Sequence, residues 1–155
     1  MLITAQIHTE EKKAMMCRDI MKPNVRCAKA QTTVAQAAAL MRDEQIGFLP
    51  ICDEGGKVIG TLTDRDIVIR VVADNHSATE PVERFMSTAV IACRSDEDLC
   101  TAQDLMGEMQ VSRIVCVSEN GQLHGVISLS DIAQLGNGVD AAATLQSVTV
   151  REVRT

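Results

Sequence analysis

The chain has 155 residues and a formal net charge of −6, and its only aromatic side chains are Phe48 and Phe85. This length predicts about one domain, whose core must be built from aliphatic side chains and methionine. The acidic balance and the scarcity of aromatic rings argue against nucleic-acid binding. No apolar run approaches the ~18 residues of a membrane span, and residues 10–13 are charged where a signal peptide would be apolar. We therefore expect a cytoplasmic protein that contacts neither nucleic acid nor membrane.

The chain contains the same segment twice, with the second copy 65 positions after the first. Identical residues recur at this offset along the whole segment: Met21 and Met86, Gln45 and Gln110, Gly60 and Gly125, and Asp66 and Asp131. A repeat of this length is a complete supersecondary unit, and stacked copies bury a shared core. Two facing copies also form two related clefts, in which we expect the functional residues.

The first copy is predicted to fold in the order β-α-β-β-α. An extended piece at 24–28 leads to a polar helix start at Thr32 and Thr33, and apolar residues then recur at helical spacing from Val34 to Met41. The remaining elements are a buried strand at 48–52, a glycine-containing turn at 53–56, a strand at 57–63 and a helix at 64–73.

The second copy is predicted to repeat this order. Its elements are an extended piece at 90–93, a helix at 98–109, a strand at 113–118, a turn at 119–121, a strand at 122–128 and a helix at 129–135. Together the two copies predict a mixed α/β (α+β) protein.

The repeat also divides the chain into five parts. These are an N-terminal arm (1–16), the first repeat (17–73), a linker (74–81), the second repeat (82–135) and a C-terminal segment (136–155). The Gly-Asn-Gly sequence at 136–138 is predicted to stop the preceding helix, and Asp140 to start another. Leu145 and Val148 would then form a docking face.

The cysteines do not follow the pattern of a metal site. None of them stands in a C-x-x-C pair, and the three histidines are scattered, whereas zinc sites usually show paired ligands at short spacing. We therefore expect reduced and mostly buried thiols. A redox- or metal-responsive switch remains the alternative function. The six are Cys17, Cys27, Cys52, Cys93, Cys100 and Cys116.

The second strand of each copy ends in the motif Gly-x-x-[Thr/Ser]-x-x-Asp. One interpretation is a capping box, in which Thr63 or Ser128 caps the next helix and Asp66 or Asp131 reaches back to the cap. However, a capping box usually uses Glu or Gln, and both copies use the shorter Asp. The other interpretation is a nucleotide site, because a carboxylate accepts hydrogen bonds from ribose hydroxyls and a helix start favours phosphate.

The two motifs in register, together with Asp19-Ile20-Met21 and the strand start at 46–50, resemble the tandem cystathionine-β-synthase (CBS) domain family, also called the Bateman module. The resemblance covers about residues 17–135. It implies two pseudo-symmetric repeats packed face to face through their sheets. It also implies a regulatory ligand containing adenosine, such as AMP, ADP, ATP, NAD or S-adenosylmethionine, with no catalytic cofactor.

The resemblance assigns ligand contacts to each cleft. For the first cleft they are Thr63 and Asp66 on phosphate and ribose, with adenine against Ile91, Val111, Ser112 and Arg113. For the second cleft they are Ser128 and Asp131, with adenine against Val25, Arg26, Ile46, Gly47 and Phe48.

Two arginines distinguish the clefts, because neither has a charged counterpart in the other repeat. Arg65 lies inside the first motif, where the second copy has Ser130, and Arg113 stands where the first copy has Phe48. A guanidinium is well suited to phosphate, so we assign Arg65 to the first cleft. Arg113 would serve the second cleft or bridge both. The alternative for each is a solvated surface charge.

The sequence favours a sensor over an enzyme. It contains no nucleophile–histidine motif and no phosphate-binding Gly-x-x-x-x-Gly-Lys loop. The segment 67–72 is apolar nearly all round, more than one buried helix face requires, and such a surface usually marks an interface. We therefore expect a homodimer that signals through its conformation or through an unidentified protein effector.

Overall fold

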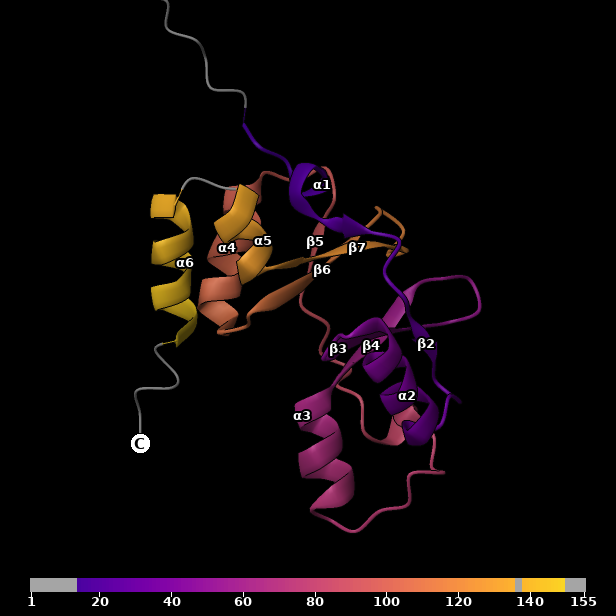
Figure 1. Ribbon diagram of the computed structural model, residues 1–155. Coiled ribbons are helices and arrows are strands. Elements are labelled where there is room, and N and C mark those ends of the chain that lie inside the picture. The colour runs from indigo at the N-terminus through magenta and orange to yellow at the C-terminus, as the bar shows by residue number, and fades with distance from the viewer. Residues whose placement is uncertain (1–13, 136–137, 150–155) are drawn as a thin grey trace, which may run out of the picture.

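The computed structural model describes residues 14–135 and 138–149. Most of the predicted N-terminal arm, and residues 136, 137 and 150–155 of the C-terminal segment, lie outside the described residues. The described part is a mixed α/β fold in which the sheets of the two repeats lie together at the centre (Figure 1). This confirms the predicted fold class. No helix within the described ranges is long and apolar enough to cross a membrane.

The first repeat follows the predicted order of elements. They are α1 (Cys17–Ile20), β1 (Lys22–Pro23), β2 (Ala28–Lys29), α2 (Val34–Glu44), β3 (Phe48–Cys52), β4 (Val58–Thr63), α3 (Asp64–Asp66) and the π-helix η1 (Ile67–Val72). Because α3 continues directly into η1, the helix predicted at 64–73 is one rod with a change of helical register. The extended piece predicted at 24–28 is absent as a single strand and is replaced by β1 and β2.

The second repeat has the same order and one additional helix. Its elements are the 3-10 helix η2 (Val82–Arg84), β5 (Ala92–Arg94), α4 (Leu99–Met109), β6 (Arg113–Val117), β7 (Leu123–Ser128), α5 (Leu129–Leu135) and α6 (Gly138–Thr149). The predicted strand and helix ranges agree with these bounds to within a few residues.

The repeats exchange their leading segments. The sheet order is β2-β3-β4 for one sheet and β1-β7-β6-β5 for the other, so β1 of the first repeat is an edge strand in the sheet of the second. It pairs antiparallel with β7 through Lys22 and Val126. In return, Ser87 of the second repeat bridges to Thr61 on β4, with N–H···O distances of 2.9 and 3.0 Å.

The repeated glycines allow this exchange. A Cβ atom on Gly125 would lie 2.5 Å from the carbonyl oxygen of Lys22, and one on Gly60 would lie 2.5 Å from the sulfur of Met86. Real Cβ atoms do not approach other atoms so closely. The identity of these two glycines at the repeat offset is therefore explained by close backbone approach.

Each repeat has its own aliphatic cluster, because each helix buries one stripe. Along α2 the buried residues are Val34, Ala37 and Met41, and along α4 they are the corresponding Leu99, Ala102 and Met106. Each stripe packs with the central strands of its own repeat, around residues such as Leu62 and Ile127. These stripes match the helical spacing predicted from the sequence.

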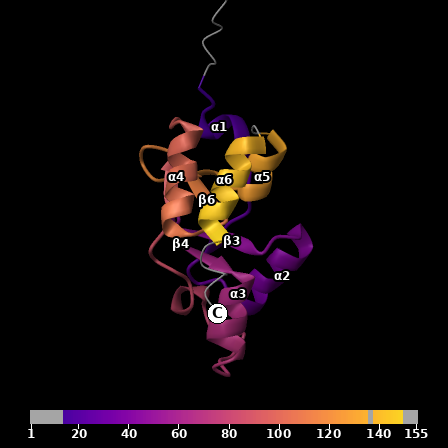
Figure 2. The same ribbon diagram turned by 90° about the vertical axis from the view of Figure 1, so that its left-hand side faces the viewer.

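Helix α6 packs on α4 and α5 (Figure 2). Its residues Thr144 and Val148 are buried against that face, whereas Leu145 is 50% exposed. Of the predicted docking face, Val148 is thus buried, whereas Leu145, its neighbour three positions earlier, lies half exposed at the edge of that face. The side chain of Asp140 lies outside the described part of the chain.

Candidate functional site

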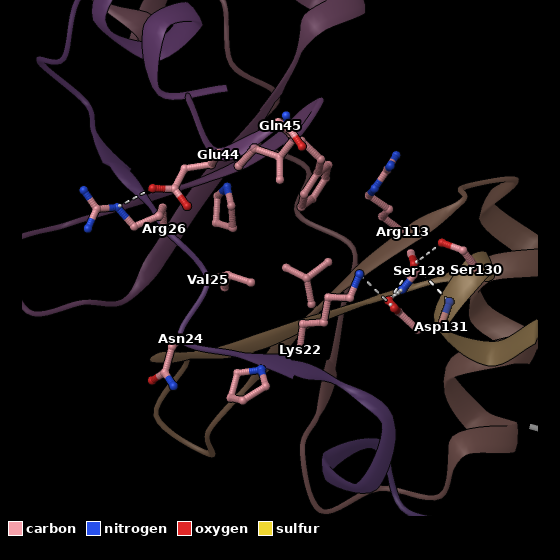
Figure 3. A pocket seen from close by; sticks show the side chains of 15 residues that line it. Lys22, Asn24, Val25, Arg26, Glu44, Gln45, Arg113, Ser128, Ser130 and Asp131 are labelled. Atoms are coloured by element: carbon pink, nitrogen blue, oxygen red, sulfur yellow. Dashed lines mark hydrogen bonds and ion pairs between the residues drawn. The ribbon is translucent and has the colours of Figure 1, made fainter. Parts of the chain in front are cut away.

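A cavity of about 330 Å³ lies between the repeats, at the start of α5 (Figure 3). One side comes from the exchanged segment around β1, another from the end of α2 and the start of β3, and the third from β6, β7 and α5. It corresponds to the second predicted cleft. Its lining consists of Lys22, Pro23, Asn24, Val25, Arg26, Glu44, Gln45, Ile46, Phe48, Pro50, Arg113, Val126, Ser128, Ser130 and Asp131.

The carboxylate of Asp131 is held by the backbone and side chain of Ser128. The Ser128 N–H and Oγ–H donate to Asp131 Oδ2 at 2.8 and 2.5 Å, and the Asp131 N–H donates to Ser128 Oγ at 3.2 Å. This is the geometry of a capping box with Asp in place of Glu. The second oxygen, Oδ1, lies 3.1 Å from the ammonium nitrogen of Lys22.

Asp131 remains ionised although only 6% of it is exposed. Burial would raise the pKa of its carboxyl group, but the hydrogen bonds from Ser128 and the charge of Lys22 outweigh burial and hold the pKa below its usual value. An ionised carboxylate only accepts hydrogen bonds. Asp131 is thus a fixed acceptor on the wall of the cavity.

Positive charge exceeds negative charge around the cavity. Lys22 is paired with Asp131, and Arg26 lies 3.8 Å from Glu44. Arg113 also lines the cavity and stands directly opposite Ser128 in the β6–β7 pairing, and its side chain extends away from Asp131 (Figure 3). The net excess of one cation favours an anionic ligand.

The first motif has the same capping geometry and a different counter-ion. The Thr63 N–H donates to Asp66 Oδ2 at 2.9 Å, and the Asp66 N–H donates to Thr63 Oγ1 at 3.0 Å. Here Asp66 Oδ1 lies 3.4 Å from Arg70, one turn further along the same helix. Arg70 also donates to the Phe85 carbonyl at 2.6 Å and to Ser87 Oγ at 3.3 Å.

Three other residues assigned to the first cleft make contacts within the second repeat. Ile91 and Val111 pack against the core cluster of the second repeat, and Arg65 is exposed. Ser112 accepts a hydrogen bond from the Leu129 N–H through its carbonyl oxygen at 3.0 Å. The sequence allowed two positions for Arg113, against adenine in the first cleft or in the second cleft. The structure places it on the lining of the second cleft.

Most residues assigned to the second cleft are brought together. Val25, Arg26, Ile46 and Phe48 line the cavity with Ser128 and Asp131. Gly47 instead lies beside the other motif: its carbonyl accepts from the Asp64 N–H at 3.1 Å, and a Cβ there would meet the Asp64 carboxylate at 2.7 Å.

Sequence reasoning missed the polar lining residues Lys22, Asn24, Glu44, Gln45 and Ser130, and the apolar ones Pro23, Pro50 and Val126. Lys22 is the most consequential, because it contacts the central carboxylate. Its position depends on β1 crossing to the sheet of the other repeat, and a two-residue strand carries no periodicity that would predict this. Ser130 could have been found from its place within the second motif.

The cysteines are thiols, four of them buried and two exposed, as the sequence predicted. In the core of the second repeat, Cys93 Sγ lies 3.6 Å from Cys116 Sγ. Hydrogen bonding with Cys116, together with burial, raises the pKa of Cys93 to about 12. Protonated buried thiols react poorly, so the redox switch is not favoured. No group of three or more metal-ligating side chains occurs among the described residues.

Comparison with known proteins gives one consistent family. The CBS domain model matches residues 17–73 and 82–137. The chain is 33% identical over 116 residues to the CBS domain-containing protein YhcV of Bacillus subtilis, covering 75% of this chain and 81% of that protein. It is also 35% identical over 120 residues to hypoxic response protein 1 of Mycobacterium tuberculosis, covering 76% of this chain and 82% of that protein.

Solved structures agree with this assignment. The crystal structure of Hypoxic Response Protein I with two coordinated zinc ions has a TM-score of 0.73 at 31% identity, covering 79% of this chain and all of that one. The CBS domain pair of protein MJ0100, in complex with 5′-methylthioadenosine and S-adenosyl-L-methionine, has a TM-score of 0.71 at 26% identity, covering 79% of this chain and 95% of that one. The family match in both repeats, the relatives and the fold together show that the chain belongs to the CBS domain family, as a tandem CBS pair.

Proposed function

We propose that this protein is a non-catalytic regulatory module that binds an adenosine-containing ligand in the second cleft. The observation that carries the proposal is the ionised Asp131 carboxylate, whose Oδ2 is held by Ser128 while Oδ1 meets the cavity-lining Lys22. A carboxylate in this position suits the hydroxyls of a ribose. The ligands of the MJ0100 pair belong to the same chemical class.

The rest of the cavity fits the other parts of a nucleotide. Val25, Ile46 and Phe48 offer an apolar wall for adenine, and no large aromatic platform is needed because base faces also pack on aliphatic groups. Arg113 has no ion pair with another described residue, so its guanidinium is available for a phosphate. We therefore favour a ligand that combines adenine, ribose and phosphate, such as AMP, ADP or ATP.

We assign a weaker site to the first cleft. Thr63 and Asp66 have the same geometry as Ser128 and Asp131, but Asp66 is paired with Arg70, which is itself fixed by two hydrogen bonds. A ligand there must displace an anchored arginine. Arg65, which is exposed, would contribute to that site only through longer-range attraction.

We favour a change in dimerisation as the way in which ligand binding is signalled. On η1, Val68, Ile69 and Val72 are 58%, 51% and 67% exposed, whereas the counterparts of Val68 and Ile69 in the second repeat are the small Ala133 and the polar Gln134. An apolar patch of this kind favours association. We infer a two-fold homodimer through η1, acting in the cytoplasm, with a protein effector as a further route for the signal.

The test is calorimetric titration of the whole protein with AMP, ADP, ATP and adenosine. Asp131→Asn keeps the shape of the side chain and removes its charge, and it should weaken binding by about 1.5–3 kcal/mol, the size of a hydrogen bond to a charged group. Asp96→Asn is the matched control, because Asp96 is an exposed residue that lies outside the cavity. Wild-type affinity in Asp131→Asn would refute the ribose role.

A further inference from the structure

Lys22 occupies the part of Asp131 that a ligand would need. Oδ2 of Asp131 already accepts two hydrogen bonds from Ser128, so Oδ1 is the oxygen left for an incoming ribose hydroxyl. Lys22 is 3.1 Å from that oxygen. A ligand seated on Asp131 must therefore displace the Lys22 ammonium or share the carboxylate with it.

Lys22 is able to move. Its side chain is 69% exposed, compared with 7% for that of Asp131, and Asp131 is the one charged partner that the ammonium has among the described residues. The side chain has a flexible four-carbon stem, while its backbone is fixed by the pairing of β1 with β7. The ammonium can thus turn within the cavity while the strand stays in place.

The first motif has no equivalent device. The counterpart of Lys22 at the repeat offset is Ser87, which is uncharged, and the counterpart of Arg70 is Leu135. The cation beside Asp66 comes from its own helix and is tied to the Phe85 carbonyl. A mobile cation opposite the capping carboxylate is therefore a property of the second cleft.

We propose that Lys22 is a specificity-determining residue, which makes the second cleft select phosphorylated adenosine ligands over uncharged or cationic ones. When a ribose takes Asp131 Oδ1, the Lys22 ammonium loses its partner, and a ligand phosphate replaces that partner. Adenosine offers no replacement, so its binding leaves an ion pair broken. S-adenosylmethionine brings a sulfonium cation into a cavity that already carries Lys22, Arg26 and Arg113. Its binding therefore breaks the Lys22–Asp131 ion pair and also adds repulsion between like charges.

The inference rests on the proposed function and predicts effects of opposite sign. In Lys22→Met, Asp131 is released from its internal partner and the phosphate loses a cation. Adenosine affinity should rise about threefold, the size of an exposed ion pair, while AMP affinity should fall about tenfold. Lys22→Arg should keep the preference for AMP. Lys57→Met is the control, because it removes the same charge from an exposed position outside the cavity.

The experiment is calorimetric titration of the wild-type protein and these variants with AMP, adenosine and S-adenosylmethionine, repeated at two salt concentrations. Lys22→Ser, which copies Ser87, provides a second uncharged variant should Lys22→Met not fold. We expect the wild-type preference for AMP over adenosine to shrink at high salt and to collapse in both uncharged variants. If Lys22→Met changes all three affinities alike or leaves them unaltered, the inference is wrong and the proposed function stands. If the wild-type protein binds none of the three, both are wrong.

Discussion

Replacing each repeated glycine by alanine tests how tightly the two repeats hold each other's leading segments. In Gly125→Ala, the new methyl group would lie 2.5 Å from the backbone oxygen of Lys22 and 3.0 Å from the sulfur of Met21. A backbone oxygen in a paired strand cannot move aside alone, so β1 must shift away from β7. Overpacking of this kind costs about 2–3 kcal/mol. In Gly60→Ala, the closest atom is the Met86 sulfur at 2.5 Å, which belongs to a flexible side chain, and the nearest backbone atom is the Ser87 oxygen at 3.1 Å.

We therefore expect Gly60→Ala to cost less than about 1 kcal/mol, since the thioether can rotate and alanine restricts the unfolded chain more than glycine does. Urea denaturation followed by circular dichroism measures both values. The same shift of β1 would carry Lys22 away from Asp131, so Gly125→Ala should also lose AMP preference. A Gly60→Ala variant that is destabilised as much as Gly125→Ala would refute the reasoning, because it would mean that backbone and side-chain obstacles are equivalent here.

Three further predictions concern charge, assembly and thiols. The pKa of Asp131 is lowered in the folded protein, so its ionised carboxylate stabilises the fold above the unfolded pKa, and this stabilisation is lost as the pH falls below about 4. The melting temperature of Asp131→Asn, measured against pH, should therefore fall less steeply at acid pH than that of the wild type. An equally steep fall would contradict this. In Val72→Lys, the mass measured by light scattering should shift from that of a dimer towards that of a monomer. Leu145→Lys, at an exposed position on α6, should not change the mass. A wild-type mass near the 16.8 kDa of one chain would refute the dimer. A thiol reagent should label Cys27 and Cys100 quickly and the four buried cysteines only on unfolding; fast labelling of more than two would contradict the buried core.

Much of the fold could be predicted because its signals are local or repeated. The apolar stripe from Val34 to Met41 and the run Phe48–Cys52 each predicted an element that the structure contains. The division of the extended piece between β1 and β2 could not be predicted, because pairing between a two-residue strand and a distant partner leaves no pattern in either segment. The π-helical register of η1 is likewise decided by packing.

The candidate site was predictable to the extent that it repeats. Asp131 and Ser128 follow from the duplicated motif, and the structure places them on a cavity wall with Ile46 and Phe48. The structure contains the capping box, in which Ser128 binds one oxygen of Asp131, and it leaves the other oxygen outside the cap, where it meets Lys22. Lys22 escaped prediction because its importance arises from a contact between repeats.

The exchange of leading segments has a consequence for how the chain folds. Lys22 pairs with a residue that leaves the ribosome roughly 100 residues later, a separation that slows folding because a long loop must close before the pairing forms. During synthesis the first repeat can assemble β2, β3 and β4. However, β1 cannot pair before β7 has been synthesised, and the edge of β4 cannot pair before Ser87 has been synthesised. The two halves should therefore mature together at the end of translation, and a nascent chain arrested before residue 123 should hold its N-terminal segment open to proteases.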